Sequence, residues 1–162
     1  MTAIFVGIGS NVEPERRVRE AIARLRERYG ALRISPVYRN PAVGFKGDDF
    51  LNLVVGFAST EDAADVHSAL NAIERACGRV RGGPRFAPRT LDLDLLLYGE
   101  LVADAPVKLP RPEILEYAYV LKPLADLAPA LRHPLTGHSF AEHWRDFPGK
   151  NQPLAVVTLT GL

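Results

Sequence analysis

The chain is poor in cysteine and has no long apolar run. Cys77 is the one cysteine among 162 residues, which excludes an internal disulfide framework. No segment approaches the roughly 18 consecutive apolar residues of a membrane-spanning helix. The first residues also lack the charged and apolar regions of a signal peptide. We therefore expect a cytoplasmic protein with no membrane partner.

The sequence also lacks an excess of either charge. The 20 Lys and Arg residues are matched by 19 Asp and Glu residues, so the net charge of +1 gives no reason to expect a nucleic-acid partner. Internal repeats and low-complexity segments are absent from the sequence. Because the length is typical of one compact domain, we expect a single domain over residues 1–162.

Positive charge is instead concentrated in one loop that is rich in glycine and proline. Four arginines occur there with no acid among them: Arg79, Arg81, Arg85 and Arg89. Arginine stays charged at physiological pH and matches phosphate oxygens in two-point contacts, so this loop suits a triphosphate. Taken alone, such a loop is often only a solvated connection.

Two acids follow the loop in a segment with the alternation of a β-strand, Leu91 to Tyr98. The alternation places Leu91, Leu93, Leu95 and Leu97 on one face and Asp92, Asp94, Leu96 and Tyr98 on the other. Asp92 and Asp94 can therefore converge on one or two cations. Mg²⁺ is typically held by one or two carboxylates plus substrate phosphates. Aspartates on a solvent-facing strand are common, but their position after the arginine loop favours a Mg-nucleotide site.

Strands and helices alternate along the first part of the chain. The patterns predict strands at Ala3 to Ile8, Ala31 to Tyr38, Phe50 to Ala58 and Leu91 to Tyr98, and helices at Pro14 to Tyr29 and from an N-cap at Thr60 through Cys77. Further apolar residues from Ile114 to Leu124 have roughly helical spacing, interrupted by Pro123, and the chain then turns irregular. We expect an α+β fold with a ferredoxin-like βαββαβ core, a largely antiparallel sheet and additional C-terminal helices on the second face, giving a three-layer α-β-α sandwich.

Weaker signals leave alternatives open. The glycines of Gly7 to Asn11 resemble a phosphate loop but lack its lysine, and favour a strand-to-helix turn. Asn52 alternates with apolar neighbours, which points its amide inward, and the pattern alone favours a backbone partner. Phe86 and Tyr119 could sandwich a flat heterocycle or simply pack in the core. Three histidines match no common zinc spacing, and we expect them at the surface: His133, His138 and His143.

The run Arg85-Phe-Ala-Pro-Arg-Thr-Leu-Asp-Leu-Asp94 resembles the signature of the 6-hydroxymethyl-7,8-dihydropterin pyrophosphokinase family. Shorter matches span most of the chain, at residues 9–11, 38–44, 50–52, 78–81 and 121–129. The resemblance implies transfer of diphosphate from ATP to the hydroxymethyl group of the pterin, a step of folate biosynthesis that leaves AMP. It implies two Mg²⁺ ions, the small-molecule substrates ATP and 6-hydroxymethyl-7,8-dihydropterin, and a monomer.

The resemblance also implies roles for individual residues. Asp92 and Asp94 would hold the ions and act in catalysis with Arg79 and Arg89. The ATP-binding residues would be Glu74, Arg81, Arg85, Arg89, Leu95, Lys108 and Arg111. The pterin-binding residues would be Asn40, Pro41, Val43, Phe50, Asn52, Phe86 and Tyr119, with Asn52 on the ring edge and the two later aromatic residues on the ring faces.

The chain departs from the family pattern near the nucleotide site. Arg111 stands where relatives usually carry a histidine, and Tyr117 and Pro106 stand at arginine positions. Lys108 would replace part of the lost charge, and Arg111 would contact phosphate from the histidine's place. The departures keep two alternatives open, a paralogue that acts on another pterin or small alcohol and a weakly catalytic regulator that binds pterin or nucleotide.

Overall fold

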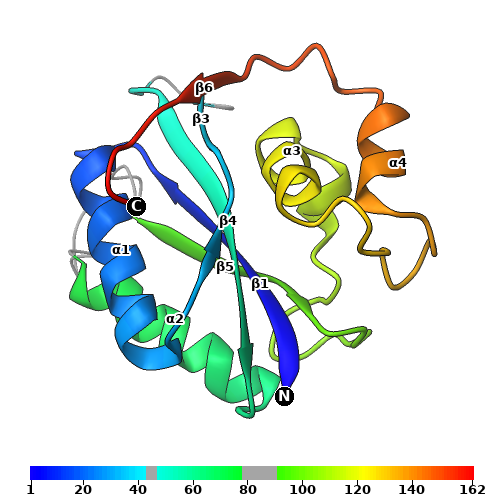
Figure 1. Ribbon diagram of the computed structural model, residues 1–162, viewed down its shortest axis with the longest axis horizontal. Helices are drawn as coiled ribbons and strands as arrows, with labels where there is room; N and C mark the ends of the chain where they lie inside the picture. The colour runs from blue at the N-terminus through cyan, green and yellow to red at the C-terminus, as the bar shows by residue number, and fades with distance from the viewer. Residues whose placement is uncertain (43–46, 78–90) are drawn as a thin grey trace.

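The computed structural model describes residues 1–42, 47–77 and 91–162, and its elements follow the predicted order (Figure 1). The strands are β1 (Thr2–Ser10), β2 (Arg33–Ile34), β3 (Val37–Asn40), β4 (Phe50–Ser59), β5 (Asp92–Tyr98) and β6 (Ala155–Val157). The α-helices are α1 (Pro14–Tyr29), α2 (Ala63–Ala76), α3 (Ala118–Leu127) and α4 (Phe140–Arg145), and a 3₁₀ turn, η1, covers Pro112–Leu115. None of the described helices has the length and apolar character needed to cross a membrane.

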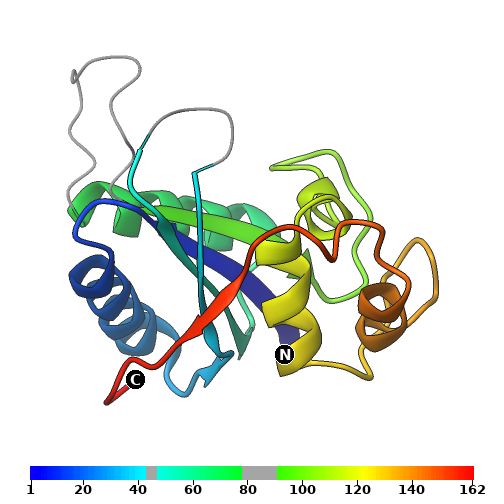
Figure 2. The ribbon, with the colours of Figure 1, turned by 90° about the horizontal axis from the view of Figure 1, so that it is seen from above.

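One antiparallel sheet organises the fold. Its strand order is β5-β1-β4-β3-β6, with β2 also paired to β4, and the described pairings are all antiparallel. Helices α1 and α2 cover one face, whereas α3 and α4 pack on the other (Figure 2). The prediction of an α+β fold with an antiparallel sheet and helices on both sides is therefore confirmed.

Alternation along β1 divides its side chains between two cores. Ile4, Val6 and Ile8 are buried against α1 and α2, whereas Phe5 packs in the second core with α3. Strand geometry sends successive side chains to opposite faces, so Gly7 and Gly9 continue the Phe5 side. The strand-to-helix turn expected at residues 7 to 11 starts only at Asn11, because β1 extends through Ser10 and α1 begins at Pro14.

Helix α1 follows directly from its sequence. Val18, Ala21, Ile22 and Leu25 are buried and recur on one helical face. Pro14 stands at the first helical position, where its missing N–H leaves no bond unmade. Gly30, with φ of 79°, ends the helix by donating its N–H to Arg26 O at 2.9 Å.

A register shift in β5 moves Leu97 to the face of the sheet opposite the predicted one. Val6 pairs with Leu95 but Phe5 pairs with Leu97, so Leu96 is an extra residue in the strand. Leu97 consequently joins Leu96 in the core beside α3, although simple alternation placed the two on opposite faces. The bulge lies after Asp94, so the shared face of Asp92 and Asp94 is unaffected.

Other local predictions need correction. Asp62 caps α2 in place of Thr60, because its Oδ1 accepts the Asp65 N–H at 2.8 Å. The strand predicted from Ala31 to Tyr38 is divided into β2 and β3 at Ser35 and Pro36. Within the described part of the chain, α4 and β6 have no counterpart in the predictions.

One of the three histidines is not at the surface. His133 is only 4% exposed, and its Nδ1 accepts the Leu135 N–H at 3.1 Å. Burial and the neighbouring His143 lower its pKa. His133 therefore acts as a neutral acceptor that closes the turn before α4, whereas His138 is exposed as expected.

Candidate active site

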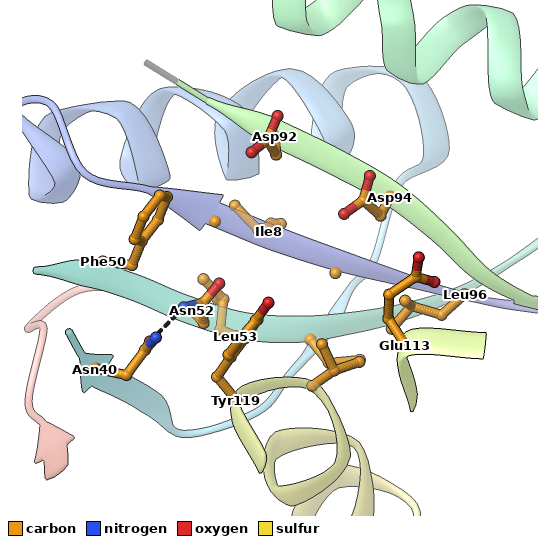
Figure 3. A pocket seen from close by; sticks show the side chains of 14 residues that line it. Ile8, Asn40, Phe50, Asn52, Leu53, Asp92, Asp94, Leu96, Glu113 and Tyr119 are labelled. Carbon is orange, nitrogen blue, oxygen red and sulfur yellow. Dashed lines mark hydrogen bonds between the residues drawn. The ribbon is translucent and has the colours of Figure 1, made fainter. Parts of the chain in front are cut away.

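A cavity of about 180 Å³ lies over the centre of the sheet, on the face that carries α3 (Figure 3). It is lined by residues from β1, β3, β4, β5, η1 and α3: Gly7, Ile8, Gly9, Asn40, Phe50, Asn52, Leu53, Val54, Asp92, Asp94, Leu96, Glu113, Tyr119 and Val120. Six of these residues are ones that the sequence assigned to metal or pterin binding. Residues far apart in the chain thus meet at one site.

The floor of the cavity is set by the register of three strands. Gly9 of β1 pairs with Asn52 of β4 on one side and Asp92 of β5 on the other. Gly7 pairs in the same way with Val54 and Asp94. Directly paired residues of an antiparallel sheet share a face. The two glycines therefore form an open trough between the carboxylates and the amide.

Gly9 leaves no room for a larger residue. A Cβ built at position 9 would lie 2.6 Å from Asn52 Oδ1, whereas one at Gly7 would lie 3.5 Å from its nearest neighbour, a methyl group of Leu96. The glycine at position 9 is explained by the close approach of the Asn52 side chain, and not by an unusual backbone conformation. Sequence reasoning missed both glycines as site residues, although a Gly-x-Gly pattern inside a strand was a visible signal.

Asp92 and Asp94 project from one face of β5 toward the cavity (Figure 3). Leu93 between them is buried in the opposite core, so packing fixes which face the acids occupy. The Asp94 side chain remains 46% exposed and therefore accessible to a ligand. Two carboxylates are too few to enclose a metal ion without further ligands. In residues 1–42, 47–77 and 91–162, no group of three or more His, Cys, Asp or Glu residues is arranged to hold a metal.

An amide pair forms the wall opposite the carboxylates. Asn52 donates from Nδ2 to Asn40 Oδ1 at 2.5 Å (Figure 3), and Asn40 donates to Pro41 O at 3.2 Å. The backbone partner favoured for Asn52 by the sequence pattern is therefore wrong. This chain of bonds orients Asn52 and leaves its carbonyl oxygen, beside Gly9, without a hydrogen bond from the described residues.

Tyr119 forms an aromatic wall. Its ring stacks on Tyr117 with centroids 5.0 Å apart and planes 19° from parallel. Burial raises the pKa of the Tyr119 hydroxyl to about 12, and nearby negative charge, including that of Asp94 and Glu113, adds to the shift. Tyr119 is consequently neutral at physiological pH.

Arg111 lies among acids at the edge of the cavity. Its Nη2 is 3.5 Å from Asp94 Oδ1, and its Nε is 3.2 Å from Glu113 Oε2. Its backbone N–H donates to Leu96 O of β5 at 3.0 Å, which fixes the segment against the edge of the sheet. Sequence reasoning named Arg111 but missed Glu113, for which the sequence offers no signal.

Glu74 supports the site from behind. It is 4% exposed, and its Oε1 accepts the Leu93 N–H at 2.7 Å. Its side chain thus binds β5 between the two aspartates and does not line the cavity. Leu95, another residue assigned to ATP, has its side chain in the core against α1 and α2.

The remaining predicted residues fall outside the cavity or outside the described residues. Pro41 lines a neighbouring hollow of about 280 Å³ that shares Asn40 and Tyr119 with the cavity. Lys108 is exposed and does not line either hollow. Six predicted site residues lie outside the described part of the chain: Val43, Arg79, Arg81, Arg85, Phe86 and Arg89.

Comparison with known proteins points to one family. Residues 5–129 match the family model described as 7,8-dihydro-6-hydroxymethylpterin-pyrophosphokinase (HPPK). The 2-amino-4-hydroxy-6-hydroxymethyldihydropteridine pyrophosphokinase of Pseudomonas aeruginosa is 41% identical over 137 residues, which cover 81% of this chain and 83% of that protein. The protein of the same name from a Synechocystis species is 34% identical over 141 residues, covering 85% of this chain and 72% of the relative.

The fold has a counterpart among solved structures. A crystal structure of HPPK-DHPS from Plasmodium falciparum superposes with a TM-score of 0.71 at 11% sequence identity. The match covers 90% of this chain but only 44% of that longer chain. At this identity the likeness shows a shared fold.

Proposed function

The chain belongs to the 7,8-dihydro-6-hydroxymethylpterin-pyrophosphokinase family, and we propose that the cavity over β1 is where it transfers a pyrophosphoryl group from ATP to hydroxymethyldihydropterin in folate biosynthesis. The assignment of the site rests on one observation: predicted pterin-binding residues and predicted metal-binding residues line the same cavity. Asn40, Phe50, Asn52 and Tyr119 stand on one side, and the acids of β5 stand on the other. A flat pterin and a triphosphate would meet between them.

The amide side suits the edge of a pterin ring. A pterin has donors and acceptors along its edge, and the Asn52 amide is held in place by Asn40. A site with a prearranged hydrogen-bonding group discriminates strongly against analogues that lack the matching group. Tyr119 would stack on one ring face, and Phe86 would stack on the other. The glycine trough would admit the ring close to the sheet.

The acidic side suits Mg²⁺ bound with ATP. Asp92 and Asp94 offer hard carboxylate oxygens on one face, and two carboxylates plus phosphate oxygens satisfy this cation. We propose that they hold two ions. Asp92 and Asp94 would hold the cation beside the phosphates, where it would supply electrostatic stabilisation of charge that develops during transfer.

The other residues would position the substrates. Asn52 and Tyr119 would hold the pterin with its hydroxymethyl oxygen toward the acids, in line with the β-phosphorus of ATP. Arg111 would contact the triphosphate from the rim of the cavity. Arg79 and Arg89, assigned from the sequence signature, would contact phosphates as transfer proceeds. Holding both reactants in one orientation is a large part of catalysis in phosphoryl transfer.

The scaffold proposed for this site is the ferredoxin-like βαββαβ core enclosed by two helical layers. The strand order β5-β1-β4-β3 and the two helical faces support it. We propose that residues 1–162 form a single domain that acts as a monomer.

The test is the identity of the nucleotide product. Purified protein incubated with Mg-ATP and 6-hydroxymethyl-7,8-dihydropterin should release AMP in amounts equal to the pterin diphosphate, and a reaction without pterin should release none. Asp92→Asn should reduce AMP formation at least 100-fold. Pterin binding without AMP release would contradict the proposed transfer and direct attention to a different acceptor.

A further inference from the structure

We propose that Glu113 is a positioning residue that holds Arg111 ready for the triphosphate of ATP. This inference rests on the proposed function of the cavity. Arg111 lies between two acids, with Nη2 3.5 Å from Asp94 Oδ1 and Nε 3.2 Å from Glu113 Oε2. One of these acids is assigned to the metal ions, so the other is the partner that Arg111 can keep when ATP is bound.

The backbone places Arg111 but does not orient its side chain. Its N–H donates to Leu96 O at 3.0 Å, and its carbonyl accepts the Ile114 N–H at 3.2 Å. The flexible side chain beyond Cα is directed by charge. Nε and Nη2 face the two acids, and the guanidinium carries further N–H donors that could contact an anionic ligand.

Glu113 is difficult to explain by folding alone. Its Oε2 is buried and receives no hydrogen bond from any described residue. The contact with Arg111 Nε is therefore an ion pair without hydrogen-bond geometry. An incompletely satisfied buried carboxylate oxygen generally destabilises a folded protein. Figure 3 shows that the same carboxylate lines the cavity near Asp94. Its position fits a role toward the ligand.

Binding of a cation and ATP would break the contact between Arg111 and Asp94 but leave the contact between Arg111 and Glu113. A cation on Asp94 would draw that carboxylate away from Arg111 and place positive charge near the guanidinium. Glu113 would then offset the charge of Arg111 and keep it at the rim of the cavity. Without Glu113, Arg111 would either remain on Asp94, in competition with the cation, or turn away from the phosphates.

A rival role for Glu113 predicts the opposite effect. If its negative charge only repelled the triphosphate, its removal would strengthen ATP binding. The positioning role predicts weaker binding of ATP and an unchanged affinity for pterin. Because Glu113 and Arg111 act through one contact, the effect of changing Glu113 should also disappear when Arg111 is absent.

The experiment compares Glu113→Gln, Arg111→Ala and the double variant by calorimetric titration with Mg²⁺ and a non-hydrolysable methylene analogue of ATP. Glu113→Gln should raise the Kd about twofold to fivefold, because the contact is partly exposed and screened. Steady-state assays should show a matching rise in KM for ATP and no change in KM for pterin. The double variant should bind no more weakly than Arg111→Ala.

Glu116→Gln is the matched control. Glu116 lies three residues further on, is exposed, and does not line the cavity, so its loss should leave the Kd unchanged. Equal or tighter binding by Glu113→Gln would overturn the proposal, as would the same loss in the presence and absence of Arg111. Wild-type protein that makes no AMP would instead refute the proposed function, so the two failures are distinguishable.

Discussion

Replacement of Gly9 by alanine should separate ligand binding from folding. The added Cβ would lie 2.6 Å from Asn52 Oδ1 and 4.0 Å from the Leu51 carbonyl oxygen. The backbone oxygen is at an ordinary distance, whereas the side-chain oxygen must move. Gly9→Ala should therefore fold normally but turn Asn52 away from its present orientation.

The two expected magnitudes differ. Alanine is favoured over glycine in a strand interior by about 0.5 to 1 kcal/mol, which offsets the loss of the Asn52–Asn40 hydrogen bond, worth about 1 kcal/mol. The free energy of unfolding should thus change by less than about 1 kcal/mol. Misplacing the amide that pairs with the pterin edge should weaken binding by about 2 to 4 kcal/mol, or about 30-fold to 1,000-fold in Kd.

Calorimetric titration with 6-hydroxymethyl-7,8-dihydropterin measures the binding, and urea unfolding measures the stability. Gly7→Ala is the control for the presence of a methyl group in the trough, since its Cβ would make an ordinary 3.5 Å contact with Leu96. Its effect on pterin binding should be much the smaller of the two. Pterin binding by Gly9→Ala that equals wild type, or that equals Gly7→Ala, would refute the reasoning.

Three further perturbations test other parts of the structure. Asp92→Asn should reduce AMP formation at least 100-fold if the carboxylate holds a catalytic cation, which corresponds to a loss of about 3 kcal/mol or more in transition-state stabilisation. Product chromatography measures the AMP formed. Glu74→Ala should lower the free energy of unfolding by about 1 to 3 kcal/mol, because the buried N–H of Leu93 loses its acceptor, and urea unfolding measures this loss. The free energy of unfolding should fall as the pH is lowered from about 7.5 to about 5.5. The reason is that the folded environment lowers the pKa of His133, so the unfolded chain binds a proton that the folded chain does not. The dependence of the unfolding free energy on pH should be weaker in His133→Asn.

Local sequence patterns were sufficient for most elements. Apolar positions at helical spacing predicted α1 with its observed bounds, Pro14 to Tyr29. Alternation predicted β5 and the shared face of Asp92 and Asp94. The pattern failed at Leu97, because the extra residue in the register depends on pairing with β1, far away in the sequence. Helix α4 has only six residues, and its apolar pattern is too short to be distinguished from an irregular segment.

The site was predictable where a residue carries its own chemical signal. The two carboxylates suggested a cation from their pattern and position, whereas Asn52 and Tyr119 were assigned to a ligand only through the family resemblance. All four residues line one cavity: Asp92, Asp94, Asn52 and Tyr119. Gly9 carries no functional group, because its role is to leave space, and its only signal was the Gly-x-Gly pattern inside a strand. Only the pairing of β1 with β4 shows which side chain needs that space.

The position of Glu113 follows from the position of β5 at the edge of the sheet. The outer side of an edge strand has backbone groups that need partners from elsewhere in the chain. In β5, Glu74 accepts the Leu93 N–H, and the Arg111 N–H donates to Leu96 O. The second bond places Arg111 beside Asp94, two residues before Leu96, and carries Glu113 to the cavity wall. The same bonds that complete the sheet thus assemble the charged rim of the site, so a change that weakens the Arg111 segment should alter ATP binding before it alters the fold.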